Sequence, residues 1–191
     1  MKERPILFSG PMVRAILEGR KTQTRRIVKP QPIEHDGVIE CGPAIAGSMH
    51  ALHQWLIANK CPYGKPGDRL WLREAISRFA MGNVVAYKAD HDGANDIKWR
   101  PSIHMPRWAS RITLDVVDVR VERLQDISEE DAKAEGCEEI TPRFYRNYLS
   151  TDGATFYSAA MSFQSLWESI NGPDSWYTNP WVWVVTFKKI N

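Results

Sequence analysis

The longest strand-like pattern in the chain limits the fold more than any other feature. From Arg111 to Leu124, apolar side chains alternate with polar ones, which predicts a long β-strand with one buried face. The apolar phase shifts after Val117, so we expect a β-bulge or a bend at that point. Whatever the other segments form, the fold must contain a sheet built around this strand.

Shorter patterns before and after the long strand predict helices and further strands. Helical spacing of apolar residues predicts helices over about 11–18, 49–60 and 156–170, and a short helix capped by Ser128 and stopped by Gly136. Strand patterns lie at 5–9, 22–28, 69–74, 84–88 and 181–187. Residues 31–48 and 89–108 lack periodicity, which predicts loops. Since strands and helices do not alternate regularly, the pattern favours an α+β fold with a small curved sheet or barrel.

The composition suits a single globular domain over residues 1–191. Hydrophobic residues make up 43% of the chain and charged residues 25%, as in soluble proteins with one sizeable core. No apolar run approaches the ~20 residues that cross a membrane, and the N-terminus lacks a secretory signal pattern. The three cysteines, Cys41, Cys61 and Cys137, predict free thiols rather than a disulfide framework. We therefore expect a cytoplasmic protein without membrane contact.

The charges are unevenly distributed although the net charge is only +2. Residues 1–30 hold eight basic and two acidic side chains, and residues 115–139 hold ten acidic and three basic ones. The first segment predicts a basic face, which suits phosphate, a nucleotide or RNA. The alternative is that the two segments form solvated surfaces that attract each other.

Three segments together resemble the ASCH family. They are Gly19–Arg26, Gly67–Glu74 and Ile127–Gly136, and the aromatic-rich strand at 181–187 also fits. The resemblance implies a small, curved PUA-like β-barrel with flanking short helices, related to RNA-binding modules. Relative to the smallest family members, the chain has insertions at about 31–65, 81–108 and 140–165, and in this it is similar to longer ASCH proteins of phages and prophages.

One branch of this family hydrolyses the exocyclic amide of N4-acetylcytidine to cytidine and acetate. The residues that act in that branch match Lys21, Thr24 and Glu135 here. The resemblance therefore implies an amidohydrolase that takes a small-molecule nucleoside, N4-acetylcytidine or a related N4-acylcytosine, and uses no metal and no cofactor. The insertions leave the substrate range open.

The implied chemistry places demands on these three residues. Thr24 can supply a hydroxyl nucleophile if Lys21 is neutral and accepts its proton. An ordinary lysine has a pKa near ~10.4, so burial or neighbouring arginines would have to lower the pKa of Lys21. Glu135 can orient Lys21 or shuttle a proton, but pairing with it would raise the lysine pKa. Since strand positions three apart face opposite sides, Lys21 and Thr24 can share a pocket only across a turn, bulge or bend.

Further residues are candidates for binding the substrate. Four polar or charged side chains can form hydrogen bonds with a nucleoside: Arg20, Arg26, Ser9 and Glu74. Two aromatic side chains, Phe8 and Trp71, can stack on a base. Each has a structural alternative. Ser9 can cap the helix that follows it, Glu74 can be a surface charge, and the aromatic rings can pack in the core.

Three other functions stay open on the sequence alone. A binding module for RNA or a modified nucleotide would use the same basic segment without catalysis. A nuclease is less well supported, because the sequence has no convincing histidine pair or metal-binding carboxylate cluster. A structural zinc site could use Cys41, His50, His53 and Cys61, although their spacing matches no familiar zinc pattern. The oligomeric state is not indicated.

Overall fold

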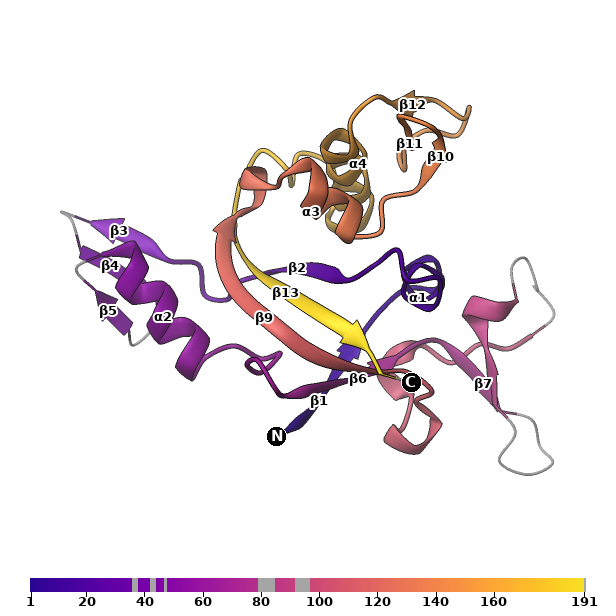
Figure 1. Cartoon of the computed structure of the whole chain (residues 1–191), viewed down its shortest axis with the longest axis horizontal. Coiled ribbons are helices and arrows are strands. Elements are labelled where there is room, and N and C mark those ends of the chain that lie inside the picture. Colours follow the sequence, from indigo (N-terminus) through magenta and orange to yellow (C-terminus); the bar gives the residue numbers. More distant parts are fainter. Residues whose placement is uncertain (36–37, 42–43, 47, 79–84, 92–96, 191) are drawn as a thin grey trace.

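A computed structural model gives the structure of the chain, and it describes all residues except 36–37, 42–43, 47, 79–84, 92–96 and 191. Its centre is a five-stranded sheet with the strand order β1-β6-β9-β13-β2 (Figure 1). These strands are β1 (Glu3–Leu7), β2 (Gln23–Ile27), β6 (Arg69–Arg73), β9 (Thr113–Arg123) and β13 (Trp181–Lys189). Only β1 and β6 pair in parallel; the other neighbours are antiparallel.

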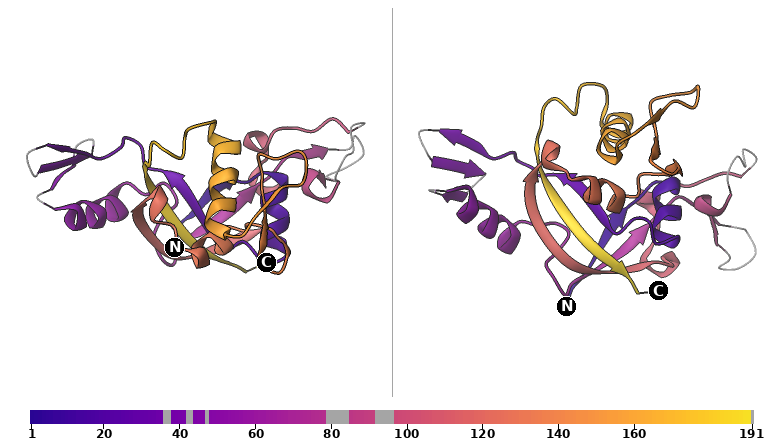
Figure 2. Two further views of the ribbon diagram at one scale, coloured as in Figure 1. Left: turned by 90° about the horizontal axis from the view of Figure 1, so that it is seen from above. Right: turned by 45° about the horizontal axis from the view of Figure 1, so that its top comes forward.

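The sheet is strongly curved, and its longest strand contains the expected bulge. β9 and β13 run side by side as one long arc (Figures 1 and 2). Their register shifts where Thr186 pairs with Asp118 and Phe187 pairs with Val116, so Val117 is the extra residue. An unpaired residue of this kind bends a strand and increases its twist. The break in the apolar pattern at Val117 was therefore a correct structural signal.

The two outer strands of the sheet, β1 and β2, approach each other at one point. The Arg26 guanidinium on β2 donates a hydrogen bond of 2.7 Å to the Leu7 carbonyl at the end of β1. The strand order has no β1–β2 pairing among the described residues. The observed architecture is thus an α+β fold around a curved, open sheet.

In the part of the chain that the structure describes, four α-helices lie around this sheet: α1 (Gly10–Leu17), α2 (Met49–Asn59), α3 (Glu129–Ala134) and α4 (Ala159–Asn171). The expected cap of α3 is present, because the Ser128 hydroxyl accepts a hydrogen bond from the Asp131 amide. Gly136 ends this helix with a positive φ of 88°, a conformation that glycine adopts without steric cost. α3 and α4 pack together above the sheet (Figure 2).

The remaining elements are small sheets and single turns outside the central sheet. The small sheets are β3 (Ile33–His35) with β4 (Val38–Cys41) and β5 (Ala44–Ala46); β7 (Ile76–Arg78) with β8 (Val85–Tyr87); and β10 (Glu139–Thr141) with β11 (Phe144–Arg146) and β12 (Thr155–Phe156). The 3-10 turns are η1 (Lys88–Asp90), η2 (Ser102–His104), η3 (Arg107–Ala109) and η4 (Leu124–Asp126).

The prediction of a loop over 31–48 was wrong, because its described part holds the three strands β3, β4 and β5. Each has only three or four residues, too few to produce a periodic pattern. The strand expected at 84–88 is β8, although Val84 lies outside the described residues. Among the helices of the described chain, none is long and apolar enough to cross a membrane.

Candidate functional site

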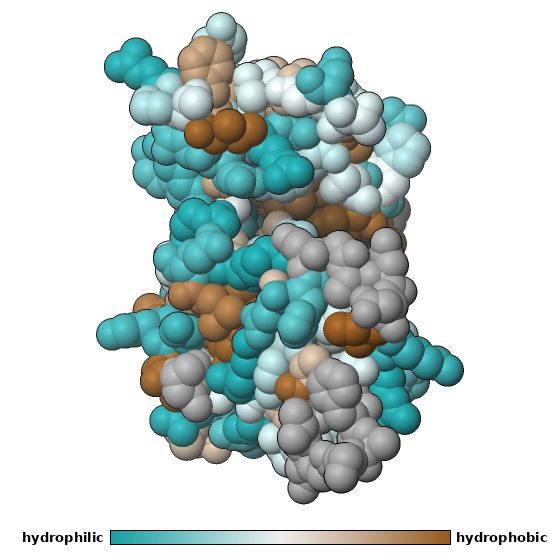
Figure 3. Space-filling view, turned by 90° about the vertical axis from the view of Figure 1, so that its right-hand side faces the viewer, coloured by the Kyte–Doolittle hydropathy of each residue, from teal (hydrophilic) through white to brown (hydrophobic). Residues whose placement is uncertain are grey.

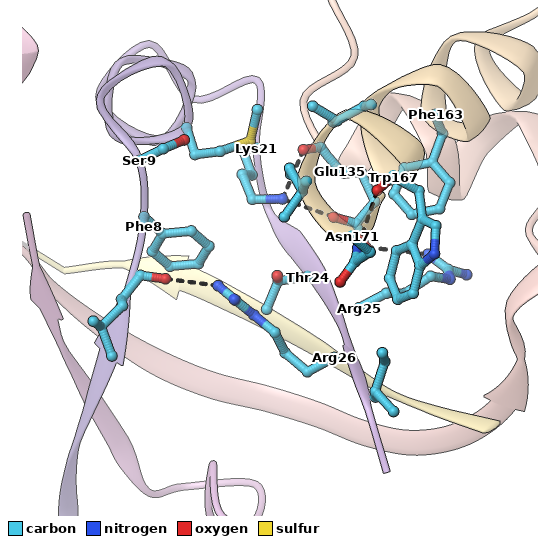
Figure 4. A pocket seen from close by; sticks show the side chains of 15 residues that line it. Phe8, Ser9, Lys21, Thr24, Arg25, Arg26, Glu135, Phe163, Trp167 and Asn171 are labelled. Atoms are coloured by element: carbon cyan, nitrogen blue, oxygen red, sulfur yellow. Dashed lines mark hydrogen bonds and ion pairs between the residues drawn. The ribbon is translucent and has the colours of Figure 1, made fainter. Parts of the chain in front are cut away.

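A cavity of about 190 Å³ lies where the ends of β1 and β2 meet the helices. Its wall is formed by Leu7, Phe8, Ser9, Met12, Lys21, Thr24, Arg25, Arg26, Ile27, Glu135, Phe163, Leu166, Trp167, Ile170 and Asn171. Figure 4 shows these side chains around the space. The volume is below the ~300 Å³ of the smaller drug-sized ligand pockets. The cavity therefore suits the reactive end of a ligand rather than a whole nucleoside.

Lys21 and Glu135 form a buried pair in this cavity. The lysine Nζ donates a hydrogen bond of 2.7 Å to Glu135 Oε2 and another of 2.7 Å to the Glu135 carbonyl. The two backbones are also joined by an isolated antiparallel β-bridge. Only 4% of Lys21 and 3% of Glu135 are exposed. Residues that are 114 positions apart are thus held at one place by main-chain and side-chain contacts.

The surroundings of Lys21 favour its neutral form. Burial lowers the pKa of the Lys21 amine below its ordinary value, although the Glu135 carboxylate acts in the opposite direction and raises it. The Arg26 cation adds a smaller lowering effect. The net direction is downward because desolvation penalises an ammonium more than this one carboxylate stabilises it. A lysine in this state can accept a proton nearer to neutral pH than an exposed lysine can.

Thr24 reaches the same cavity because the chain is irregular just before it. Lys21 lies in the bridge to Glu135, Thr22 is outside any strand, and β2 begins at Gln23. The Thr22 amide donates to the Ala134 carbonyl at 2.8 Å, and the Thr22 carbonyl accepts from the Phe187 amide at 2.8 Å. Figure 4 shows the Thr24 hydroxyl pointing into the cavity toward the end of Lys21. Lys21 and Thr24 therefore line one cavity across this irregular stretch.

Three of the expected binding residues line the same space. Phe8 is buried at the cavity wall, and the Arg26 guanidinium lies 5.2 Å from the centre of its ring. The Lys21 amine lies 5.7 Å from the same ring centre. Ser9 lines the cavity and is the N-cap residue of α1, but its side chain makes no capping hydrogen bond. Its hydroxyl is therefore not committed to the cap that its position suggested.

The other three expected binding residues lie outside this cavity. Arg20 binds Glu18 and donates to the Gly136 carbonyl at 3.2 Å. Trp71 lies on β6, with the guanidinium groups of Arg73 and Arg107 at 5.3 and 5.8 Å from its ring centre.

Glu74 is the third, and it belongs to a separate ion pair. Its two carboxylate oxygens accept hydrogen bonds of 2.9 and 3.1 Å from Arg111. Only 1% of Glu74 is exposed. Burial raises the pKa of its carboxyl, and Arg111 partly offsets this. Glu74 is therefore a buried structural carboxylate and not a second acid in the cavity.

Sequence reasoning did not identify the residues that α4 contributes. Phe163, Leu166 and Trp167 form an apolar wall, Ile170 stands at its edge, and Asn171 adds an amide. The helical spacing on one face of α4 was visible in the sequence. Nothing in that spacing shows that the face covers Lys21 and Glu135, because the contact depends on how α4 packs against α3.

Arg25 was also missed as a contact of the site. It follows Thr24 on β2 and also lines the cavity. Its side chain is fully buried, and its guanidinium contacts Glu135 Oε1 at 3.5 Å. The sequence presents this residue as one of several surface cations. Its burial follows from the cover that α3 and α4 place over β2.

A wider groove of about 760 Å³ adjoins the cavity. The two spaces share Ser9, Met12, Leu166 and Ile170, so they lie next to each other. The groove is lined by α1, α4 and the segment around β11. Figure 3, seen from the right-hand side of Figure 1, shows the molecule hollowed below the part that carries β10, β11 and β12. A ligand whose reactive end fills the cavity has room for the remainder in this groove.

The cysteines and histidines of the alternative zinc set serve other contacts. All three cysteines are free and buried, as expected. The Cys41 thiol donates to the Pro30 carbonyl, and the His53 ring packs against Trp181 at 5.0 Å. Within the described ranges, no group of three or more histidine, cysteine or acidic side chains is arranged to hold a metal.

Comparison of the chain with protein-family models, curated proteins and solved structures found no match. The function is therefore inferred from the residues of the site.

Proposed function

We propose that this protein is an ASCH-like amidohydrolase that cleaves the exocyclic amide of N4-acylcytosine nucleosides, with N4-acetylcytidine as the reference substrate. The observation that carries the proposal is the convergence of Lys21, Thr24 and Glu135 in one cavity. Lys21 and Thr24 come from one segment, Glu135 lies 114 positions after Lys21, and each has the side chain that the family resemblance requires. The lowered pKa of Lys21 supports its role as the base.

In the first half of the reaction, Thr24 Oγ attacks the acyl carbon of the amide. The hydroxyl proton passes to neutral Lys21 Nζ as the C–O bond forms. The resulting tetrahedral intermediate collapses with cleavage of the C–N bond, and the Lys21 ammonium returns the proton to the departing exocyclic nitrogen. The products of this half are cytidine and an acyl ester on Thr24.

In the second half, water attacks the threonine ester while Lys21 accepts one of its protons. Cleavage of the ester bond restores the Thr24 hydroxyl with the proton held by Lys21 and releases the carboxylic acid, which loses its own proton to solvent and becomes the carboxylate. Glu135 holds Lys21 in place through the hydrogen bond to Oε2. Arg26 is the candidate stabiliser of the oxyanion, since its guanidinium lies across Phe8 at the cavity wall.

The curved sheet supports the family assignment. β1 and β2 are the two ends of the strand order, and the hydrogen bond from Arg26 to the Leu7 carbonyl spans the gap between them. We interpret this arrangement as a PUA-like barrel that opens between β1 and β2. The site then lies in the opening, where the two free strand ends present side chains to a ligand.

The test is release of cytidine from N4-acetylcytidine by the purified protein, with and without a chelator. Thr24→Ala is assayed beside the wild type, and circular dichroism verifies that both are folded. The proposal predicts release that persists in the chelator and disappears in the variant. Retained turnover in Thr24→Ala would remove Thr24 as the nucleophile.

A folded wild-type protein that releases no cytidine from several N4-acyl substrates would contradict the proposal. The alternative is then a non-catalytic module that binds RNA or a modified nucleotide. Its affinity should fall as salt increases, because binding would depend on neutralised phosphates. The burial of Lys21 and Arg25 leaves fewer exposed cations than the sequence indicated, so we place hydrolysis first.

A further inference from the structure

Arg25, which lines the candidate site, is the buried centre of a partly exposed network of charges. Its NH2 group contacts Asp131 Oδ2 at 2.7 Å and Glu122 Oε2 at 3.2 Å. Its NH1 group donates to Gln23 Oε1 at 2.6 Å and reaches Glu135 Oε1 at 3.5 Å. One guanidinium thus connects β2, β9 and α3.

The network is anchored at its outer end by a second arginine. Arg120 on β9 contacts Asp131 Oδ2 at 2.6 Å and also binds Glu122. The Phe163 ring on α4 lies 5.9 Å from the Arg25 guanidinium carbon and helps to enclose it. Since Asp131 and Glu122 are each shared by both arginines, neither carboxylate can shift without breaking contacts to two cations. This fixes the position of Arg25.

The two oxygens of Glu135 consequently face different cations. Oε2 accepts from Lys21 at 2.7 Å, and Oε1 lies near Arg25 at 3.5 Å. All three side chains are nearly or fully buried. In a medium that screens charge poorly, a second cation near a carboxylate weakens the hold of that carboxylate on the first. Arg25 therefore competes with Lys21 for Glu135.

We propose that Arg25 is a positioning residue of this site, which holds Oε1 of Glu135 from the rigid Asp131–Glu122–Arg120 network so that only Oε2 faces Lys21. The inference rests on the proposed function, and extends it to a residue that does not touch the scissile bond. Arg25 keeps Glu135 oriented and limits the stabilisation that Glu135 gives to the Lys21 ammonium. The base thereby stays available near neutral pH.

Few other charged groups act on the Lys21 amine. Arg26 on β2 lowers the pKa of Lys21, and Cys137 after α3 acts in the opposite direction. Burial raises the pKa of the Cys137 thiol to about 12, so this thiol stays neutral through the working range. The neighbouring cavity residues from α1 and α4, Met12 and Asn171, are uncharged. A change at Arg25 should therefore reach Lys21 through Glu135.

The test compares the pH dependence of kcat/KM for the wild type and Arg25→Met. Without the Arg25 cation, Glu135 should stabilise the Lys21 ammonium more strongly, so the pKa of Lys21 should rise. We expect the acidic limb of the profile to move up by about one pH unit, with kcat/KM at pH 7 about tenfold lower and recovery at higher pH. An Arg25→Met variant that loses activity equally at every pH would overturn the proposal.

Arg120→Met is the matched control. It removes a cation from the same network that has no contact with Glu135 within the described chain. The proposal predicts a clearly smaller shift than in Arg25→Met, whereas an equal shift would assign the effect to the general charge of the network and overturn the positioning role. Thermal unfolding of both variants verifies that they fold.

A measurement that does not depend on catalytic turnover tests this inference separately from the proposed function. NMR of lysine-labelled protein, with the Lys21 signal assigned by Lys21→Met, gives the titration of its amine directly. A higher Lys21 pKa in Arg25→Met supports the network even if no N4-acyl substrate is cleaved. An unchanged pKa contradicts it even if the wild type is an active hydrolase.

Discussion

Lys21 is held between two opposing electrostatic effects, and the balance decides whether it can act as a base. Desolvation favours the neutral amine, and Glu135 favours the ammonium. The sequence identified both residues but not the balance, because that depends on burial and on the position of Arg25. Arg25 itself was indistinguishable from its neighbours in the basic segment. Arg25 is a buried partner of Glu135 because α3 covers β2.

Replacement of Lys21 by methionine tests the base directly. Methionine keeps an apolar chain of similar length in the buried position but cannot accept a proton. We expect kcat/KM to fall by about 10²–10⁴-fold, the usual contribution of a general base. In the wild type, kcat/KM should rise with pH as the amine loses its proton, with a midpoint below the ordinary lysine value of 10.5.

The pH profile of the Lys21→Met variant provides the control. Its residual activity should lack the acidic limb seen in the wild type, and high pH should not restore it, in contrast to Arg25→Met. A variant that retains the wild-type limb would show that another group titrates in the reaction. Steady-state assays from pH 6 to 10 distinguish the two outcomes.

At the scale of elements, the sequence predicted the strands and helices that have a long repeat or a clear cap, and it missed two groups of short strands. β9 and its bulge, α1, α2 and α4 each have enough residues to establish a period. β3, β4 and β5 lie in a segment expected to be loop, and β10, β11 and β12 in one treated as an insertion. These strands have two to four residues each, so their pairing depends on neighbours that the sequence does not reveal.

The position of Lys21 depends on Gly136, the glycine that follows the C-terminal end of α3. A Cβ added to Gly136 would lie 2.9 Å from the Lys21 Cβ and 3.2 Å from the Ala15 Cβ. The positive φ of 88° at this glycine would add roughly 1–2 kcal/mol of strain for any other residue. Gly136 therefore allows α1, α3 and the Lys21 backbone to meet closely.

Gly136→Ala should consequently displace Lys21 from its contact with Glu135. We expect a decrease in the free energy of unfolding of about 2 kcal/mol or more, from strain and crowding together, and at least a tenfold loss of kcat/KM in the protein that remains folded. Urea unfolding and steady-state assays measure the two effects.

Gly153→Ala is the control, because Gly153 also has a positive φ but a Cβ added there would have nothing within 4 Å. Equal activity losses in both variants would contradict the role of close packing at Gly136.

At the scale of the whole molecule, the cavity lies between two parts that the chain brings together from distant positions. The curved sheet supplies Phe8, Thr24 and Arg26 from β2 and the end of β1, and the helical part supplies Glu135 beside α3 and the wall of α4 (Figure 4). The sequence indicated Thr24 and Glu135 through the family resemblance, and Phe8 as an aromatic group that can stack on a base. It could not indicate the wall of α4, because the approach of α4 depends on the packing of α3 against α4.

A ligand that fills this cavity should therefore stabilise both parts at once. Thr24→Ala is suited to the test, since it should bind N4-acetylcytidine without cleaving it. At a ligand concentration of 100 times Kd, binding contributes about 2.7 kcal/mol, which for a chain of this size corresponds to a rise in Tm of roughly 5–10 °C. Uridine, which lacks the exocyclic amide, should give a clearly smaller rise in Tm.

Hydrogen exchange then shows which elements the ligand stabilises, and we expect slower exchange in both β2 and α4. Protection confined to β2 would show that α4 covers the cavity without contacting the ligand, and the substrate range would then be set by the sheet alone.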